Sequence, residues 1–169
     1  PQGALLANPA SLPPDTAFSC SWSPSGSFLA VGTNQSPYVI VYYYNGSTFT
    51  KLADPATLPS GPVMGVAWHP NSRYLAVAHT GSPYVTVYVV NPPASGSTDI
   101  TKAASNPATL PANNAVDVAW SPDGRILSVA HAASPYVSNY AFVISPTSLT
   151  KIADPSTLPG GNGSGVSWS

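Results

Sequence analysis

Short apolar runs separated by turn residues follow one another along the whole chain. In the middle of the sequence, runs rich in Val, Ala, Tyr and Thr cover residues 62–68, 73–79 and 84–90, and a shorter run covers 98–103. Runs of this length, bounded by Pro, Gly, Asn and Ser, are typical of β-strands and too short for helices. Pro70-Asn71-Ser72, between the first two runs, is a tight-turn sequence. This stretch therefore predicts four short antiparallel strands, which we call A to D.

The same pattern repeats through the chain. A block of the form Asn/Asp-Pro-Ala/Ser-Ser/Thr-Leu-Pro begins at positions 8, 54, 106 and 154, and nine residues after its last Pro comes a tryptophan: Trp22, Trp68, Trp120 and Trp168. Ser-Pro-Tyr begins fourteen residues after each of the first three tryptophans. Only the distance from that Tyr to the first Pro of the next block varies, at 17, 23 and 19 residues. A stretch of constant length joined to one stretch of variable length indicates a structural repeat with a single variable surface loop.

A four-stranded unit repeated every 46 to 52 residues predicts the blades of a β-propeller. In the run 84–90, valines alternate with Tyr and Thr, so both faces of the sheet are expected to be buried between neighbouring blades. We expect an all-β fold over residues 1–169, with four-stranded antiparallel blades at about 16–52, 62–103 and 114–151. Flanking strands are expected at 3–7 and 164–168, which makes about three and a half blades.

Two segments also resemble a known family. Residues 22–31, which begin Trp-Ser-Pro-Ser-Gly, and residues 120–129, which begin Trp-Ser-Pro-Asp-Gly, resemble the hairpin of strands A and B in WD-repeat propellers. The combination of Lys-Leu-Ala-Asp-Pro-Ala-Thr-Leu-Pro (51–59) with Ser-Pro-Tyr-Val-Thr-Val-Tyr (82–88) is similar to repeat propellers of bacteriophages, prophages and environmental bacteria. This resemblance implies a structural or binding role. The sequence departs from the WD pattern at the end of strand C, which lacks Trp-Asp.

Three and a half blades cannot close a ring, because closed propellers have about four to eight blades. We expect the chain to be a slice of a longer propeller, because its first residue is Pro1 and not an initiator Met. The alternative is that the chain is half of a two-chain ring. In both cases its partner is protein, either a second copy or the rest of a larger assembly. The total number of blades stays open.

Charge and composition exclude several partners. Charged residues make up 7% of the chain, and five Lys and Arg against six Asp give a net charge of −1. Nucleic-acid binding relies on clustered Lys and Arg, so no nucleic-acid partner is expected. No apolar run approaches the roughly 20 residues that span a bilayer, which argues against membrane insertion. Cys20 is the single cysteine and cannot form an internal disulfide.

No catalytic or metal site stands out. The acids are all Asp and form no evident pair, and no Ser lies in a Gly-x-Ser-x-Gly elbow, so we expect no enzyme and no cofactor. His69, His79 and His131 come from different strands without Cys or Glu beside them, which predicts structural histidines and no metal. Asp117 lies in a strand A facing the central channel, where a lone solvated charge is expected.

The loops between strands B and C offer the best candidate ligand site. Asn34 and Gln35 lie in one such loop, and Tyr38, Tyr84 and Tyr136 begin strand C in the three units. Aromatic rings beside amides and hydroxyls suit sugars, whereas Tyr at constant spacing also suits packing between blades. We expect a non-enzymatic structural or binding propeller of an extracellular or virion-type assembly, such as a phage tail or surface appendage, mediating protein contacts or adhesion. The alternative is a soluble carbohydrate-binding propeller that takes glycans.

Overall fold

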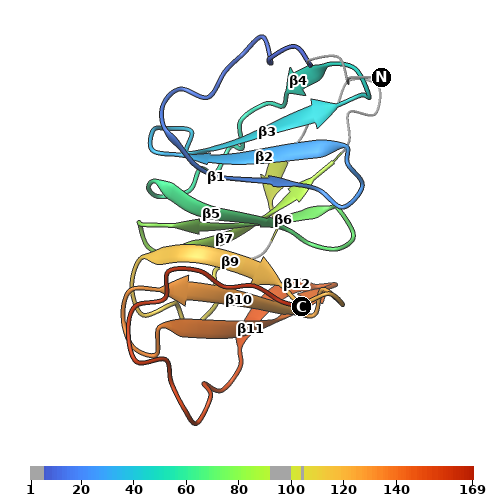
Figure 1. The fold of residues 1–169 in the computed structure, drawn as a ribbon. Helices are drawn as coiled ribbons and strands as arrows, with labels where there is room; N and C mark the ends of the chain where they lie inside the picture. The colour runs from blue at the N-terminus through green and yellow to red at the C-terminus, as the bar shows by residue number, and fades with distance from the viewer. Residues whose placement is uncertain (1–5, 92–99, 104) are drawn as a thin grey trace.

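Three antiparallel sheets form the molecule. The computed structural model describes residues 6–91, 100–103 and 105–169, and in these it contains twelve strands and no helix. The all-β fold with four-stranded blades is thereby confirmed (Figure 1). Blade 1 consists of β1 (Ala17–Trp22), β2 (Phe28–Thr33), β3 (Val39–Tyr44) and β4 (Phe49–Lys51); blade 2 of β5 (Val63–Trp68), β6 (Tyr74–His79), β7 (Val85–Val90) and β8 (Ile100–Lys102); blade 3 of β9 (Ala115–Trp120), β10 (Ile126–His131), β11 (Val137–Ile144) and β12 (Thr147–Lys151).

Within each blade the strands pair in sequence order, so every connection is a hairpin. The register is the same in the three blades: Trp22 lies opposite Leu29, Trp68 opposite Leu75, and Trp120 opposite Leu127. Each first hairpin contains one residue of positive φ, namely Gly26 (71°), Ser72 (60°) or Gly124 (72°). The left-handed conformation closes the turn, and glycine takes it without strain.

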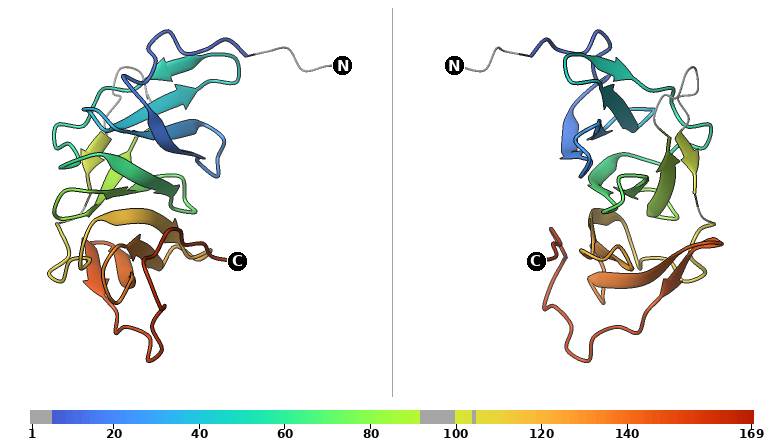
Figure 2. Two further views of the ribbon diagram at one scale, coloured as in Figure 1. Left: turned by 60° about the vertical axis from the view of Figure 1, so that its left-hand side comes forward. Right: turned by 90° about the vertical axis from the view of Figure 1, so that its right-hand side faces the viewer.

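The blades stack face to face, as the propeller pattern predicts. Figures 1 and 2 show β1, β5 and β9 following one another along one edge of the stack, where β5 contacts both of its neighbours. Because successive side chains of a strand point to opposite faces, Val85 and Val87 join the core shared with blade 3. Tyr88 and Val90 join the core shared with blade 1. Blade 2 is therefore apolar on both faces.

The expected flanking half-blade is not formed by strands. Residues 164–168 were expected to form a strand A but lie outside regular secondary structure. A strand A is held by hydrogen bonds to its strand B, and none of the described strands pairs with residues 164–168. Of the expected strand 3–7, residues 3–5 lie outside the described part, and Leu6 and Ala7 are not in a strand. Residues 98 and 99 of the expected run 98–103 also lie outside it.

Candidate functional site

The five predicted ligand residues lie at one end of the blades. Asn34, Gln35 and Tyr38 are in the β2–β3 loop, and Tyr84 and Tyr136 are at the corresponding positions of blades 2 and 3. Asn34 and Gln35 are exposed, whereas Tyr38, Tyr84 and Tyr136 are half-buried and lie one in each blade. The three tyrosines do not begin strand C but precede it, with φ between 65° and 69°. Sugar binding by these residues stays a prediction.

The backbone gives these tyrosines a structural role. The Tyr38 amide donates to the Gln35 carbonyl at 2.8 Å, and the Tyr38 carbonyl accepts from the Thr33 amide at 2.8 Å, with the same pattern at Tyr84 and Tyr136. The rings of Tyr38 and Tyr84 pack against the two interblade cores. Each tyrosine therefore closes the turn between strands B and C.

Two histidines are fully buried within their blades. His79 Nε2 lies 3.0 Å from Thr86 Oγ1, and His131 Nε2 lies 3.0 Å from Ser138 Oγ. Burial lowers the pKa of His79 to about 4 and also lowers the pKa of His131, so both rings are neutral at pH 7. No cluster of three potential metal ligands occurs in the part of the chain that the structure describes.

Sequence reasoning missed these pairs, although the repeat contains a signal for them. The polar partner stands seven residues after each histidine. In blade 1, Thr33 and Ile40 occupy the two positions, so the histidine and the hydroxyl are replaced together. A pair that changes together within a repeat indicates contact.

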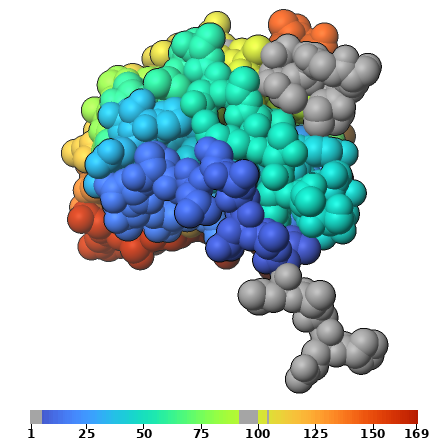
Figure 3. Space-filling view, turned by 90° about the horizontal axis from the view of Figure 1, so that it is seen from above, coloured from blue at the N-terminus to red at the C-terminus, as the bar shows by residue number. Residues whose placement is uncertain are grey.

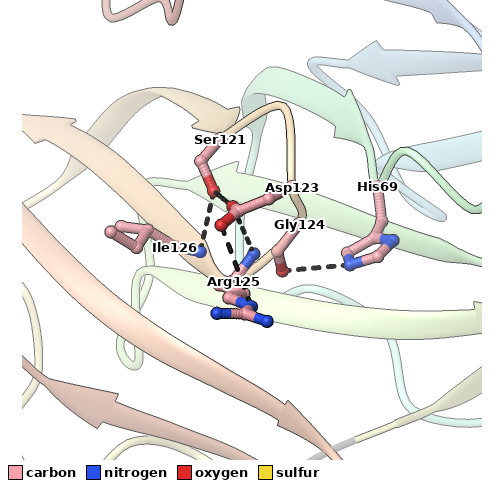
Figure 4. Close-up of polar contacts among 6 residues, drawn as sticks. All are labelled: His69, Ser121, Asp123, Gly124, Arg125 and Ile126. Atoms are coloured by element: carbon pink, nitrogen blue, oxygen red, sulfur yellow. Dashed lines mark hydrogen bonds and ion pairs between the residues drawn. The ribbon is translucent and has the colours of Figure 1, made fainter.

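His69, unlike the other two histidines, makes its contact between two blades. Figure 4 shows its ring beside the first turn of blade 3, where Nε2 lies 3.0 Å from the Gly124 carbonyl oxygen. Nδ1 accepts the Asn71 amide at 3.1 Å, so Nε2 carries the proton and donates. Burial lowers the pKa of His69. Position 124 has room only for glycine, since a Cβ there would lie 2.2 Å from His69 Nε2.

Asp117 is not the lone solvated charge that was expected. It is half-buried on β9, where Oδ1 accepts the Val118 amide at 2.9 Å and Oδ2 accepts the Val166 amide at 3.0 Å. Its backbone also lies close to β5, since a Cβ on Gly65 would be 2.7 Å from Asp117 Cα. The carboxylate therefore fixes the segment 161–169 against the edge of the stack.

The outer face of blade 1 is the most distinctive apolar surface. Trp68 and Trp120 are only 6% and 7% exposed, because each packs on the preceding blade, whereas Trp22 at the same position is 47% exposed. Trp68 Nε1 donates to the Ser21 carbonyl at 3.0 Å, and Trp120 Nε1 donates to the Ala67 carbonyl at 3.1 Å. The described residues contain no preceding blade for Trp22.

Three aromatic rings form the centre of this face. The Trp22 ring centroid lies 5.8 Å from Tyr44 and 5.8 Å from Phe49, and Leu29 on β2 is partly buried beside them. We call Trp22, Leu29, Tyr44 and Phe49 the blade 1 end face. Figure 3 looks onto this end of the stack. Its chemistry is that of the faces that blades 2 and 3 bury.

The opposite end of the stack is partly covered by the chain itself. Trp168 is 43% exposed, and its Nε1 donates to Ser128 Oγ at 3.1 Å. The Gly163 amide donates to the His131 carbonyl at 3.2 Å. Residues 161–169 thus lie against blade 3 where a following strand A would lie, although they form no ladder with it. Both ends of the stack are thus partly covered by the chain itself, since at the blade 1 end the Tyr42 hydroxyl donates to the Ser11 carbonyl at 2.8 Å.

Comparisons with known proteins agree with this architecture. The family model "WD domain, G-beta repeat" matches residues 55–83, which include β5 and β6. No curated protein matches the sequence. No helix in the described residues is long and apolar enough to cross a membrane.

Several solved structures are similar in fold. A Bacteroides fragilis protein named as a "putative 6-phosphogluconolactonase" aligns with a TM-score of 0.73 at 14% identity, over 92% of this chain and 42% of that one. Saccharomyces cerevisiae Sqt1 aligns with a TM-score of 0.65 at 14% identity, over 85% and 36%. A chain of a mitotic checkpoint complex aligns with a TM-score of 0.61 at 19% identity, over 89% and 42%.

These likenesses establish a WD-repeat-like β-propeller fold. The chain spans about two fifths of the length of the structures that it matches. The similarity to phage, prophage and environmental bacterial propellers stays a prediction.

Proposed function

We propose that this chain is a non-enzymatic, protein-binding propeller element whose blade 1 end face docks against a blade-like protein surface. The exposure of Trp22 carries this proposal, because the same tryptophan is buried at both blade interfaces of this molecule. The partner surface resembles the face that blade 1 itself presents to Trp68, where Phe28 stacks on the indole at 5.6 Å beside small aliphatic residues such as Ala30 and Val41.

The gain from such docking is large enough to matter. Lowering the exposure of Trp22 from 47% to the 6–7% of its counterparts removes about 100 Å² of a side chain that buries up to roughly 250 Å². At about 25 cal/mol per Å² of apolar surface, this contributes about 2.5 kcal/mol to association.

The carboxylates of Asp54, Asp117, Asp123 and Asp154 support a role without catalysis, because each of these four already has a structural partner. Asp54 pairs with Lys51 at 2.6 Å, Asp154 pairs with Lys151, and Asp123 accepts from Ser121 Oγ. Asp117 accepts two backbone amides.

We further propose that the assembly is extracellular or of the virion type, with the chain contributing protein contacts or adhesion. The low content of charged residues, 7%, supports contacts that do not depend on salt. A role in protein binding also suits the neighbour that comes from a mitotic checkpoint complex.

Light scattering of the purified chain as a function of protein concentration tests the docking face. A second copy brings blade faces of the same kind, so we expect the mass to rise reversibly with concentration. Trp22→Ser should weaken association by about 70-fold, the equivalent of roughly 2.5 kcal/mol.

Phe18→Ser is the matched control. Phe18 is also exposed, at 44%, but its counterparts Met64 and Val116 take no part in the interblade cores. A chain that stays monomeric at every concentration, or that associates equally well with either substitution, contradicts the proposal.

A carbohydrate-binding propeller is the second candidate, favoured by the exposure of Asn34 and Gln35 beside the half-buried Tyr38. A glycan array tests it. Specific sugar binding that is lost when the loop before Tyr84 is changed would support it, and an array without specific signals would contradict it.

A further inference from the structure

A pocket of about 390 Å³ lies between the first turns of blades 1 and 2. These turns are at the opposite end of the strands from the loops that contain Asn34 and Gln35. The pocket is lined by aromatic rings and by hydroxyl and amide groups, among them Phe28, Tyr43, Ser25, Ser27, Asn71 and Ser72. Its size is within the range of roughly 300–1,000 Å³ that is usual for small-molecule sites.

At the corresponding place between blades 2 and 3, a side chain of the protein fills the space. The His69 ring lies there, with centroids 5.7 Å from Tyr74 and 5.6 Å from Phe142, and with Nε2 bonded to the Gly124 carbonyl. Figure 4 shows this ring approaching the turn from the side. The second interface therefore contains a polar five-membered ring where the first contains a pocket.

Smaller residues leave the first interface open. Ser23 stands where blade 2 has His69, and Val90 stands where blade 3 has Phe142. The Ser23 hydroxyl does not reach across the interface, because it accepts the Phe28 amide of its own blade at 3.0 Å. The Ser25 amide donates to Ser72 Oγ at 2.8 Å and holds the two turns together beside the space. The pocket is thus specific to the interface between blades 1 and 2.

Among the described residues that line the pocket, Arg73 is the one charged side chain. Arg125 holds the same position in blade 3. Arg125 has Asp123 two residues before it, at 3.9 Å, whereas Arg73 has the neutral Asn71. Both turns are otherwise alike, since Asn71 Oδ1 and Asp123 Oδ1 each accept the arginine amide at 3.0 Å. The first turn of blade 2 therefore keeps the guanidinium and has no carboxylate at the position of Asp123.

We propose that this pocket binds a hexuronic acid unit of an acidic saccharide. The sugar ring fills the space that the His69 ring fills in the next interface, against the rings of Phe28 and Tyr43. The Ser and Asn groups bond to the sugar hydroxyls, as polar groups do around a ring that covers an aromatic face. The sugar carboxylate pairs with Arg73 and takes the place of the missing Asp. This site is independent of the blade 1 end face.

An NMR titration of the ¹⁵N-labelled chain with sodium glucuronate tests the proposal, with glucose and sodium acetate as comparison ligands. We expect shifts of the backbone amides in residues 25–27 and 71–73. The Kd for glucuronate should be about tenfold lower than the Kd for either comparison ligand, because glucose lacks the charge and acetate lacks the ring.

Three variants sharpen the test. Arg73→Gln should weaken glucuronate binding about tenfold and leave glucose binding unchanged. Arg125→Gln removes the matching arginine outside the pocket and should change neither affinity.

The double variant S23H/S72G copies the His69–Gly124 arrangement into the first interface and should abolish binding of both sugars. Its glycine is needed because a Cβ opposite the ring would clash, and Ser72 already has φ of 60°.

The outcomes separate the alternatives. Equal affinity for acetate and glucuronate would show a simple anion site and overturn the sugar assignment. Absence of shifts with glucuronate, or equal weakening by Arg73→Gln and Arg125→Gln, would overturn the site itself. Urea unfolding verifies that S23H/S72G is folded, and if it is not, the two arginine variants still decide.

Discussion

The buried His79 predicts a specific loss of stability in mild acid. Its pKa is about 4 in the folded chain, because burial disfavours the imidazolium, against 6.5 for an unperturbed histidine. Below pH 6.5 the unfolded chain therefore binds a proton that the folded chain does not. The free energy of unfolding falls by up to about 1.4 kcal/mol per pH unit from this group, until the pH reaches about 4.

Between pH 7 and pH 5 the contribution of His79 amounts to about 2 kcal/mol. His69 and His131, whose pKa values are also lowered, add to the loss in the wild-type chain. Urea unfolding followed by tryptophan fluorescence at the two pH values measures the total. The variant His79→Gln keeps a hydrogen-bonding group beside Thr86 but takes up no proton, so its loss should be about 2 kcal/mol smaller.

Thr86→Val is the control for this experiment. It removes the hydroxyl 3.0 Å from His79 Nε2 and keeps the ring buried, so the loss between pH 7 and pH 5 should stay near that of the wild type. If His79→Gln loses as much stability as the wild-type chain over this range, His79 is not held neutral by burial and the reasoning is refuted.

Three further substitutions test separate contacts. Tyr88→Phe removes the bond from its hydroxyl to the Thr57 carbonyl and should cost about 1 kcal/mol, whereas Tyr140→Phe should be neutral or stabilising, because that buried hydroxyl has no partner among the described residues; urea unfolding compares the two. Gly65→Ala places a Cβ 2.7 Å from Asp117 Cα and should lower the unfolding free energy by about 2 kcal/mol or more in the same assay, and a neutral result would contradict the close approach of β5 and β9. Asp117→Ala should speed hydrogen exchange at the Val166 amide and leave exchange in β5 to β8 unchanged, and an unaltered Val166 rate would contradict the bond.

Much of the fold follows from the sequence, because the repeat imposes the same local rules three times. The positions of Trp68 and Val85 already indicate strands with two buried faces, and the structure places them in the cores on opposite sides of blade 2. The segment 164–168 was predicted wrongly. Its residues match those of a strand A, but a strand also needs a hydrogen-bonded neighbour, which local pattern does not report.

The site was harder to predict, since it depends on differences between repeats and not on what they share. Tyr38 and its counterparts were selected as aromatic rings beside amides and hydroxyls, and the structure adds that their backbone closes turns. The features with functional potential are the deviations: Trp22, which is exposed where its counterparts are buried, and Ser23 where blade 2 has His69. Their meaning depends on which faces meet, and that is visible only in three dimensions.

Oxidative footprinting of the four tryptophans, read by mass spectrometry at increasing protein concentration, tests the central claim most directly. Cleavage after Lys and Arg separates the four residues into different peptides. In dilute solution Trp22 and Trp168 should react readily while Trp68 and Trp120 are protected, and at high concentration Trp22 should become protected as its face is covered. Similar reactivity of all four tryptophans would contradict the stacked blades. A Trp22 that stays fully reactive while the chain associates, as shown by the rise in particle mass, would contradict the docking face.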